Sequence, residues 1–155
     1  MPITFRKATP SDAPMLKEIS AQVIRTNYTS FLGADAVDDF IKSGLADKEI
    51  DDGIDSCTVM VNETVILGFA ILHDDLLHLI MVDVPYQGSG YGRMLLTKLE
   101  DHLFETYPTI HLQTFEDNTN AVQFYLKNNW VITKSEQIPS MNKTMLFFSK
   151  CKPFV

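Results

Sequence analysis

One segment of the chain has the residue types and spacing of a phosphate-binding loop. An apolar strand ends at Val82, and three glycines then follow at every second position (Gly88, Gly90 and Gly92) just before an amphipathic helix. Glycine lacks a Cβ atom, so it adopts positive φ readily and lets backbone N–H groups approach a ligand. The first helical turn adds N–H groups without intrahelical partners and the positive end of the helix dipole. These features predict a cradle for a phosphate or pyrophosphate.

Two common glycine-rich loops do not fit this segment. A nucleoside-triphosphate loop needs a Lys-Ser or Lys-Thr pair directly after its last glycine, and neither pair follows Gly92. The dinucleotide pattern Gly-x-Gly-x-x-Gly is one residue longer than the Gly-x-Gly-x-Gly of this chain. Glu116 follows a later strand, where a ribose-binding acid would be expected, but too few residues come after it to complete a doubly wound sheet.

The size and composition are those of one globular domain. The chain has 155 residues, of which 45% are hydrophobic and 21% charged, enough for one sizeable core. No apolar run reaches the ~18 residues that span a bilayer, and the first residues lack an apolar signal segment. Cys57 and Cys151 are too few and too far apart for a disulfide framework. We therefore expect one domain, residues 1–155, in a cytoplasmic protein that does not bind membranes.

The charge and the histidines exclude further classes. A net charge of −7 argues against nucleic acid as a partner, because nucleic-acid affinity rests on cationic contacts to phosphates. An acidic surface is compatible with a cationic small-molecule substrate. The four histidines show no spacing typical of metal ligands, so we predict no metal site.

Hydrophobic periodicity and turn residues predict the element order β-α-α-β-β-β-α-β-α-β-β. Strands are expected over residues 3–6, 57–61, 65–72, 76–82, 109–115, 130–133 and 144–148. Helices are expected from the Thr9–Asp12 cap to about Ile24, over 34–43, from the glycine loop to Pro108, and around Ala121–Leu126. The acidic segment 47–55 is expected to be a solvated loop. The first strands are expected to pair antiparallel, and one crossover is expected through the helix after the glycine loop.

Two motifs and this element order resemble one known superfamily. Gln87-Gly-Ser-Gly90-Tyr-Gly92 matches the pattern Gln/Arg-x-x-Gly-x-Gly/Ala and resembles the coenzyme A pyrophosphate loop of the GNAT acetyltransferases. Asn118-Thr-Asn-Ala-Val-Gln-Phe-Tyr125 resembles their Asn-x-x-Ala-x-x-Phe-Tyr segment, and the resemblance covers essentially the whole chain. Asn129-Trp130 replaces the usual Gly-Phe that follows, and asparagine tolerates the left-handed conformation that glycine would supply.

The resemblance implies a fold and an activity. The fold would be a single-domain α/β (α+β) GNAT fold, a central mixed and mostly antiparallel sheet flanked by helices. The activity would be direct transfer of an acetyl group from acetyl-CoA, the cosubstrate, to a primary amine of a small molecule or peptide, with no metal. A homodimer would be consistent with the family. The alternative is a non-enzymatic acyl-CoA sensor or a partner-binding module, since fold alone does not fix function.

The resemblance also implies which residues bind the donor. Backbone N–H groups at the strand end and in the glycine loop would contact it, and one of them would polarise the thioester carbonyl. Arg93 would add charge near the pyrophosphate. Asn118 would contact the coenzyme or a bound water, and the same residue could also cap the next helix. The full expected set is Met81, Val82, Val84, Gln87, Gly88, Ser89, Gly90, Tyr91, Gly92, Arg93 and Asn118.

Two side chains are candidates for proton transfer. Tyr125 is the candidate general acid, because a phenol with a pKa near 10 is protonated at neutral pH and can give its proton to a departing thiolate. His78 is the candidate base, because an alkyl amine must lose a proton before it attacks. Glu116 is a weaker alternative to His78. Tyr28 and Phe31 fall where the family's variable acceptor wall lies.

Overall fold

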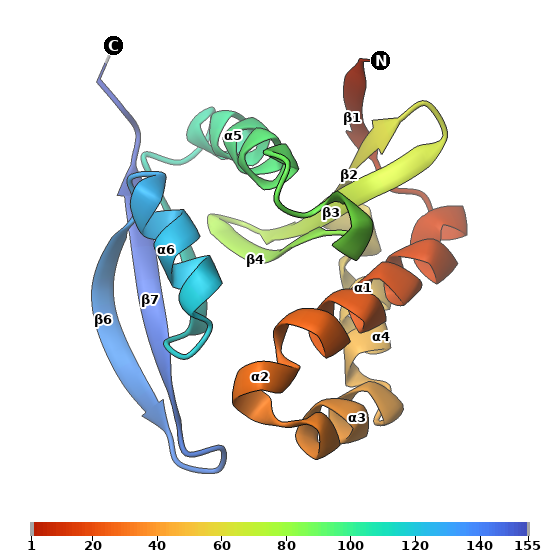
Figure 1. Ribbon diagram of the computed structural model, residues 1–155. Helices are drawn as coiled ribbons and strands as arrows, with labels where there is room; N and C mark the ends of the chain where they lie inside the picture. Colours follow the sequence, from red (N-terminus) through yellow and green to blue (C-terminus); the bar gives the residue numbers. More distant parts are fainter. Residues whose placement is uncertain (1, 155) are drawn as a thin grey trace.

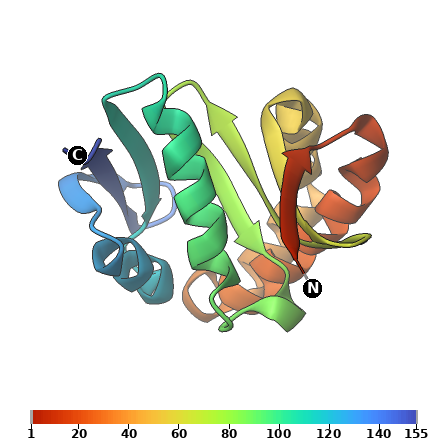
Figure 2. The same ribbon diagram turned by 90° about the horizontal axis from the view of Figure 1, so that it is seen from above.

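The computed structural model describes residues 2–154, which form a seven-stranded sheet with helices on both faces (Figures 1 and 2). The strands lie in the order β1-β2-β3-β4-β5-β7-β6. All neighbouring pairs are antiparallel except β4 and β5, which are parallel. The strands are β1 (Ile3–Lys7), β2 (Cys57–Asn62), β3 (Val65–His73), β4 (Leu76–Val82), β5 (Thr109–Phe115), β6 (Val131–Ile138) and β7 (Lys143–Cys151). The expected mixed, mostly antiparallel α/β fold is confirmed.

The sheet separates two hydrophobic clusters, and helices cover each of them. Helices α5 and α6 cover one face of the sheet around a cluster that includes Leu95, Leu99 and Trp130. Helices α1, α3 and α4 cover the other face around a cluster that includes Leu16 and Ile50. The helices are α1 (Ala13–Asn27), α2 (Thr29–Leu32), α3 (Ala34–Lys42), α4 (Leu45–Gly53), α5 (Tyr91–Phe104) and α6 (Thr119–Lys127). Within residues 2–154 no helix is long and apolar enough to cross a membrane.

The expected acidic loop over 47–55 is wrong, because most of this segment is helix α4. Ala46, Ile50 and Gly53 recur at helical spacing and are buried, so they fix one face of the helix against the core. The acidic residues occupy the remaining surface, where the Lys48 ammonium pairs with the Asp52 carboxylate at 2.7 Å. The high acidic content of the segment suggested a loop although the apolar spacing is helical.

Other expected boundaries differ by a few residues at element ends. Helix α1 continues past Ile24 to Asn27, and the following polar segment contains the short helix α2. Strand β6 extends to Ile138 and is exposed over nearly its whole length, because it is an edge strand paired only with β7. Asn129 has φ of +71°, which agrees with the expectation that asparagine replaces a left-handed glycine there.

The sheet opens between its two parallel strands. Leu76 and His111 are the one register pair that joins β4 to β5 among the described residues, and beyond it the two strands diverge. Figure 1 shows β7, β6 and α6 on one side of this divergence, with β4 and α1 on the other. Helix α5 packs against β3, β4 and β5 and therefore holds both parts of the sheet together.

Candidate functional site

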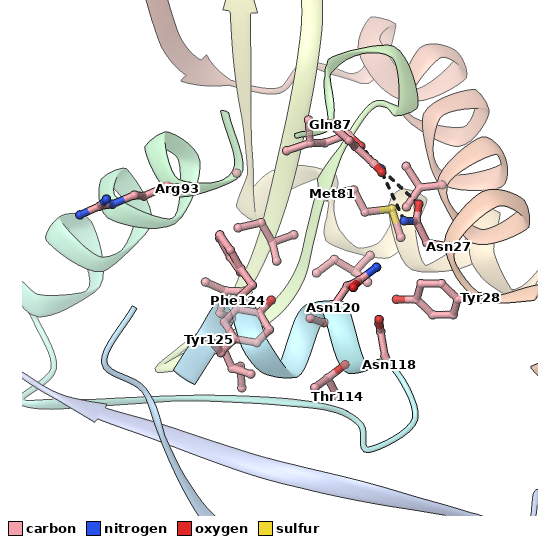
Figure 3. A pocket seen from close by; sticks show the side chains of 18 of the residues that line it. Asn27, Tyr28, Met81, Gln87, Arg93, Thr114, Asn118, Asn120, Phe124 and Tyr125 are labelled. Carbon is pink, nitrogen blue, oxygen red and sulfur yellow. Dashed lines mark hydrogen bonds between the residues drawn. The ribbon is translucent and has the colours of Figure 1, made fainter. Parts of the chain in front are cut away.

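A cavity of about 580 Å³ lies where β4 and β5 diverge. Strand β4 forms one wall, and β5 with α6 forms the opposite wall. The end of α1 and the glycine loop line the remaining sides (Figure 3). The residues that line it are Val23, Asn27, Tyr28, Leu77, His78, Leu79, Ile80, Met81, Val82, Gln87, Gly88, Gly90, Gly92, Arg93, Leu112, Gln113, Thr114, Asn118, Asn120, Ala121, Phe124 and Tyr125. The fold thus brings both sequence motifs to one cavity.

The glycine loop presents a run of unpaired backbone donors. Gly88 and Gly90 have φ of +79° and +88°, a region that residues with a Cβ atom rarely adopt, and a Cβ built on either would meet open space. The Met94 N–H is the first in α5 that bonds to a backbone carbonyl, that of Gly90, at 3.2 Å. The six N–H groups of residues 88–93 have no acceptor among the described residues. This is the donor array that an anion at a helix N-terminus requires.

The Gln87 side chain is used within the protein. Its Nε2 donates to the Val82 carbonyl at 2.9 Å and to Asn27 Oδ1 at 3.2 Å, and its Oε1 accepts from Asn27 Nδ2 at 3.2 Å (Figure 3). The Gln87 N–H donates to the Val84 carbonyl at 3.3 Å. Gln87 therefore fixes the loop to the end of β4 and to α1.

The other expected donor-binding residues have different positions. Met81 and Val82 line the cavity at the end of β4, whereas Val84, Ser89 and Tyr91 are not among its lining side chains. The backbone N–H groups of Ser89 and Tyr91 have no acceptor among the described residues. Arg93 lines the cavity, but its side chain extends outward along α5, away from the other labelled residues in Figure 3.

Asn118 occupies the N-cap position of α6, yet its side chain makes no capping hydrogen bond within the described residues. The expected side-chain cap is therefore not formed, and Asn118 lines the cavity. Asn120 lines the cavity one residue into the helix. The polar ends of Asn118, Asn120 and Tyr28 converge in Figure 3.

Tyr125 is buried against the core while lining the cavity. Its ring is 7% exposed and packs edge-on against Phe124 and Trp130, with centroid distances of 5.3 and 6.1 Å. Burial, with a smaller contribution from the nearby Tyr28, raises the pKa of Tyr125 well above its usual value. The phenol therefore holds its proton over the physiological range, as a general acid must.

His78 lines the cavity from β4, opposite α6, and its side chain is 29% exposed. Burial lowers the pKa of His78, and the Glu49 carboxylate opposes this shift. The imidazole is therefore mainly neutral at pH 7, the form that accepts a proton. Glu116 does not line the cavity, so the geometry favours His78.

Tyr28 and Phe31 form an aromatic contact at the cavity's edge. Tyr28 lines the cavity, and burial raises its pKa. Phe31 is not a lining residue, but its ring packs at a tilt against Tyr28, with a centroid distance of 5.4 Å, and against Phe115 of β5 at 5.8 Å. The two aromatics thus link the helical arm around α2 to the far side of the divergence.

Sequence reasoning missed several cavity residues. Asn27, Gln113 and Thr114 line the cavity. Asn27 reaches it because α1 continues past the predicted end. Thr114 and Gln113 lie near the end of β5, where strand divergence exposes side chains that a continuous sheet would cover. Asn120 and Phe124 belong to the recognised motif, and their helical spacing could have suggested a shared face.

Comparisons with known proteins agree with this geometry. The sequence profile described as "Acetyltransferase (GNAT) family" matches residues 22–130. The chain belongs to the GNAT acetyltransferase family. Many solved structures of this family share its fold at low identity. The PaiA N-acetyltransferase of Thermoplasma acidophilum, solved with coenzyme A, is 15% identical with a TM-score of 0.82, over 98% of this chain and 100% of that one.

The descriptions of two further similar proteins mention acetyl-CoA and peptidyl-lysine. YncA from Salmonella typhimurium, described as a putative acetyltransferase with its cofactor acetyl-CoA, is 15% identical with a TM-score of 0.69, over 100% of this chain and 97% of that one. The peptidyl-lysine N-acetyltransferase YjaB of Salmonella typhimurium is 27% identical over 77 residues. That match spans half of this chain and half of the length of YjaB.

Proposed function

We propose that this GNAT protein transfers an acetyl group from acetyl-CoA to a primary amine by direct attack within a ternary complex. The observation that carries the proposal is one continuous cavity that joins three features. These are the glycine loop, whose residues 88–93 have unpaired amides and whose Gly88, Gly90, Gly92 and Arg93 line the cavity, a buried phenol at Tyr125 and a mainly neutral imidazole at His78. Acetyl-CoA supplies an activated acyl group as a thioester, and the chain supplies the binding and proton-transfer groups.

The loop fits a pyrophosphate on chemical grounds. Its donors are backbone N–H groups next to the positive end of α5, and they need no reorganisation to receive an anion. Gly88 and Gly90 have open space where a side chain would otherwise block the approach. The residues of β4 that diverge from β5 offer main-chain groups to the pantetheine arm and the thioester. A backbone donor aimed at the developing oxyanion contributes roughly 2.7–4 kcal/mol in enzymes of this type of chemistry.

Two side chains divide the proton transfers. Tyr125 gives a proton to the departing thiolate, supported by its protonated state at neutral pH and its position on α6 beside the cavity. His78 accepts the proton that the acceptor ammonium must lose. Asn118 and Asn120 orient the bound molecules, supported by side-chain amides that face the cavity.

The acceptor is an amine that enters between Tyr28 and His78. No Asp or Glu is among the lining residues that the structure describes, so the overall acidity of the chain does not select a cation inside the cavity. Two acids of α4 pair with lysines, Asp51 with Lys17 at 2.9 Å and Asp52 with Lys48 at 2.7 Å. The name of the relative YjaB makes peptide lysine one acceptor class to test beside small amines.

The test is incubation with acetyl-CoA and a panel of small amines and lysine-containing peptides, with free thiol as the readout. Thiol release that depends on one acceptor class supports the proposal and names the class. Coenzyme A binding without thiol release from any member favours the non-enzymatic sensor instead. A Tyr125→Phe, His78→Gln double variant controls for thioester hydrolysis that does not need the site.

A further inference from the structure

We propose that Glu49 is a positioning residue for the proposed base, so that Glu49 and His78 act as one proton-accepting pair that opens from the cavity to solvent. The inference rests on the proposed function, since it assumes that an acceptor ammonium loses its proton in this cavity. It concerns helix α4, which the sequence did not predict and which contributes no lining residue to the cavity.

The backbone of β4 redirects His78. Leu77 is the register partner of Leu72 in β3, and Leu79 is the partner of Ile71, so His78 lies between them without a partner. A single extra residue in one strand is a β-bulge, a feature that turns a side chain and is common beside active sites. We attribute to this bulge that His78 both lines the cavity and reaches Glu49 of α4, on the face of the sheet that α1, α3 and α4 cover.

Two titratable groups lie against the imidazole. Glu49 Oε1 of α4 is 3.8 Å from His78 Nε2, and the His73 ring of β3 lies over the His78 ring with a centroid distance of 4.6 Å. Glu49 is 43% exposed, so the pair connects the cavity wall to bulk water. Tyr28 lines the same cavity within electrostatic reach of Glu49. Among the described residues, Glu49 and His73 are the charged groups that act on the pKa of His78.

The charges around the imidazole act in opposite directions. Burial lowers the pKa of His78, the Glu49 carboxylate raises it, and a protonated His73 would lower it. Burial alone would leave a weak base. The carboxylate stabilises the imidazolium that forms when the proton arrives, and thereby restores basicity without charging the imidazole beforehand.

The proposed proton transfers account for every proton of the reaction. A proton leaves the acceptor ammonium for His78, and the freed lone pair forms the C–N bond with the thioester carbonyl carbon. The C–S bond breaks, and the thiolate takes the Tyr125 hydroxyl proton. The nitrogen loses its second proton as the amide forms, and this proton restores Tyr125 through solvent. His78 releases its own proton to water past Glu49, so one proton is released per turnover.

The test is a Glu49→Gln variant of the full chain, followed by an NMR titration of the His78 imidazole that is assigned with His78→Gln. Two unit charges about 4 Å apart in a water-like medium correspond to a shift of about 0.7 pH unit. We expect the pKa of His78 to fall by about that amount. The acidic limb of kcat/KM should move to lower pH by the same amount, with a plateau about three- to tenfold lower. Coenzyme A affinity should not change.

Two control variants sharpen the test. Asp47→Asn removes the same charge from the exposed surface of α4 and should leave the His78 titration in place. Glu49→Asp keeps the charge and should restore most of the pH profile. An unchanged His78 titration in Glu49→Gln, or a shift equal to that of Asp47→Asn, contradicts the pair while leaving the proposed function standing. A wild-type protein that binds coenzyme A but releases no thiol with any amine overturns both.

Discussion

At the scale of single residues, the buried position of Tyr125 bears both on core packing and on the proposed proton donation. Its ring fills the core beside Trp130 and Phe148, and the same burial that packs the ring raises its pKa. The phenol is therefore protonated near neutrality and has a proton to give to the thiolate, although the raised pKa makes it a weaker acid than an exposed phenol. Packing and proton donation therefore depend on different atoms of the same side chain, and a variant can separate them.

Tyr125→Phe removes the hydroxyl and keeps the ring. We expect turnover to fall about 100-fold because the thiolate loses its proton donor, while coenzyme A affinity and the melting temperature change little. Steady-state kinetics with free-thiol detection, together with thermal unfolding, measures both. Unchanged turnover would remove Tyr125 as the acid. Loss of affinity equal to loss of turnover would assign it to binding.

The sequence identified the residues that a short motif carries and missed those that only the fold brings close. Gly88, Gly90, Asn118 and Tyr125 belong to two local patterns and all line the cavity. Asn27 reaches the loop across 60 positions of sequence, through two hydrogen bonds to one side chain. No local signal encodes such a contact, because it depends on how α1 packs against β4. The roles of the motif residues stay predictions until they are tested.

At the scale of elements, the contact between α1 and the glycine loop determines how well the cradle is preorganised. The paired amides of Asn27 and Gln87 hold the loop, and the Gln87 bond to the Val82 carbonyl orders its start. A loop with two positive-φ glycines would otherwise have many conformations. Part of the donor affinity then depends on a contact that never touches the donor's phosphates.

We expect Asn27→Ala and Gln87→Ala each to weaken coenzyme A binding about tenfold, because a looser loop must be ordered at binding. The double variant should be little worse than Gln87→Ala, since both remove the same contact. Calorimetric titration of the four proteins measures this coupling. Gln123→Ala, on the exposed surface of α6, is the matched control. Fully additive losses would mean that the two amides act separately.

The element order was predicted well because hydrophobic periodicity is local. The failure at α4 has a physical cause: Ala46, Ile50 and Gly53 are few and lie among acids, so the buried face is weak in sequence although Ile50 is fully buried. The divergence of β4 from β5 and the bulge at His78 arise from pairing between distant strands. Those two features shape the site most, and sequence periodicity does not contain them.

At the scale of the whole molecule, a sheet that opens in the middle must be held together elsewhere. Glu100 of α5 provides such a link. Its carboxylate accepts from Trp130 Nε1 at 2.9 Å and from Lys150 Nζ of β7 at 2.8 Å, and Lys150 also donates to the Asn128 carbonyl at 3.0 Å. The carboxylate is nearly buried and is satisfied by both partners. It connects α5 to the part of the sheet beyond the cavity.

Glu100→Ala should lower the free energy of unfolding by about 2–3 kcal/mol, because in a largely buried place it leaves the Lys150 ammonium without its carboxylate partner and the Trp130 N–H without an acceptor. Denaturant unfolding measures the loss. Asp101→Ala, at the next and exposed position of α5, is the control and should cost less than about 0.5 kcal/mol. Equal losses in the two variants would mean that α5 does not couple the two parts of the sheet through Glu100.

The central claim is that backbone amides of residues 88–93 bind the pyrophosphate of coenzyme A, and calorimetric titration with coenzyme A tests it most directly. Gly90 and Gly44 both precede a helix with left-handed φ of +88° and +82° and open space around them, but only Gly90 lines the cavity. We predict saturable binding by the wild type and by Gly44→Asp, and none by Gly90→Asp, whose carboxylate blocks and repels the phosphates. Wild-type protein that gives no heat at millimolar coenzyme A, or a Gly90→Asp variant that keeps full affinity, would contradict the account.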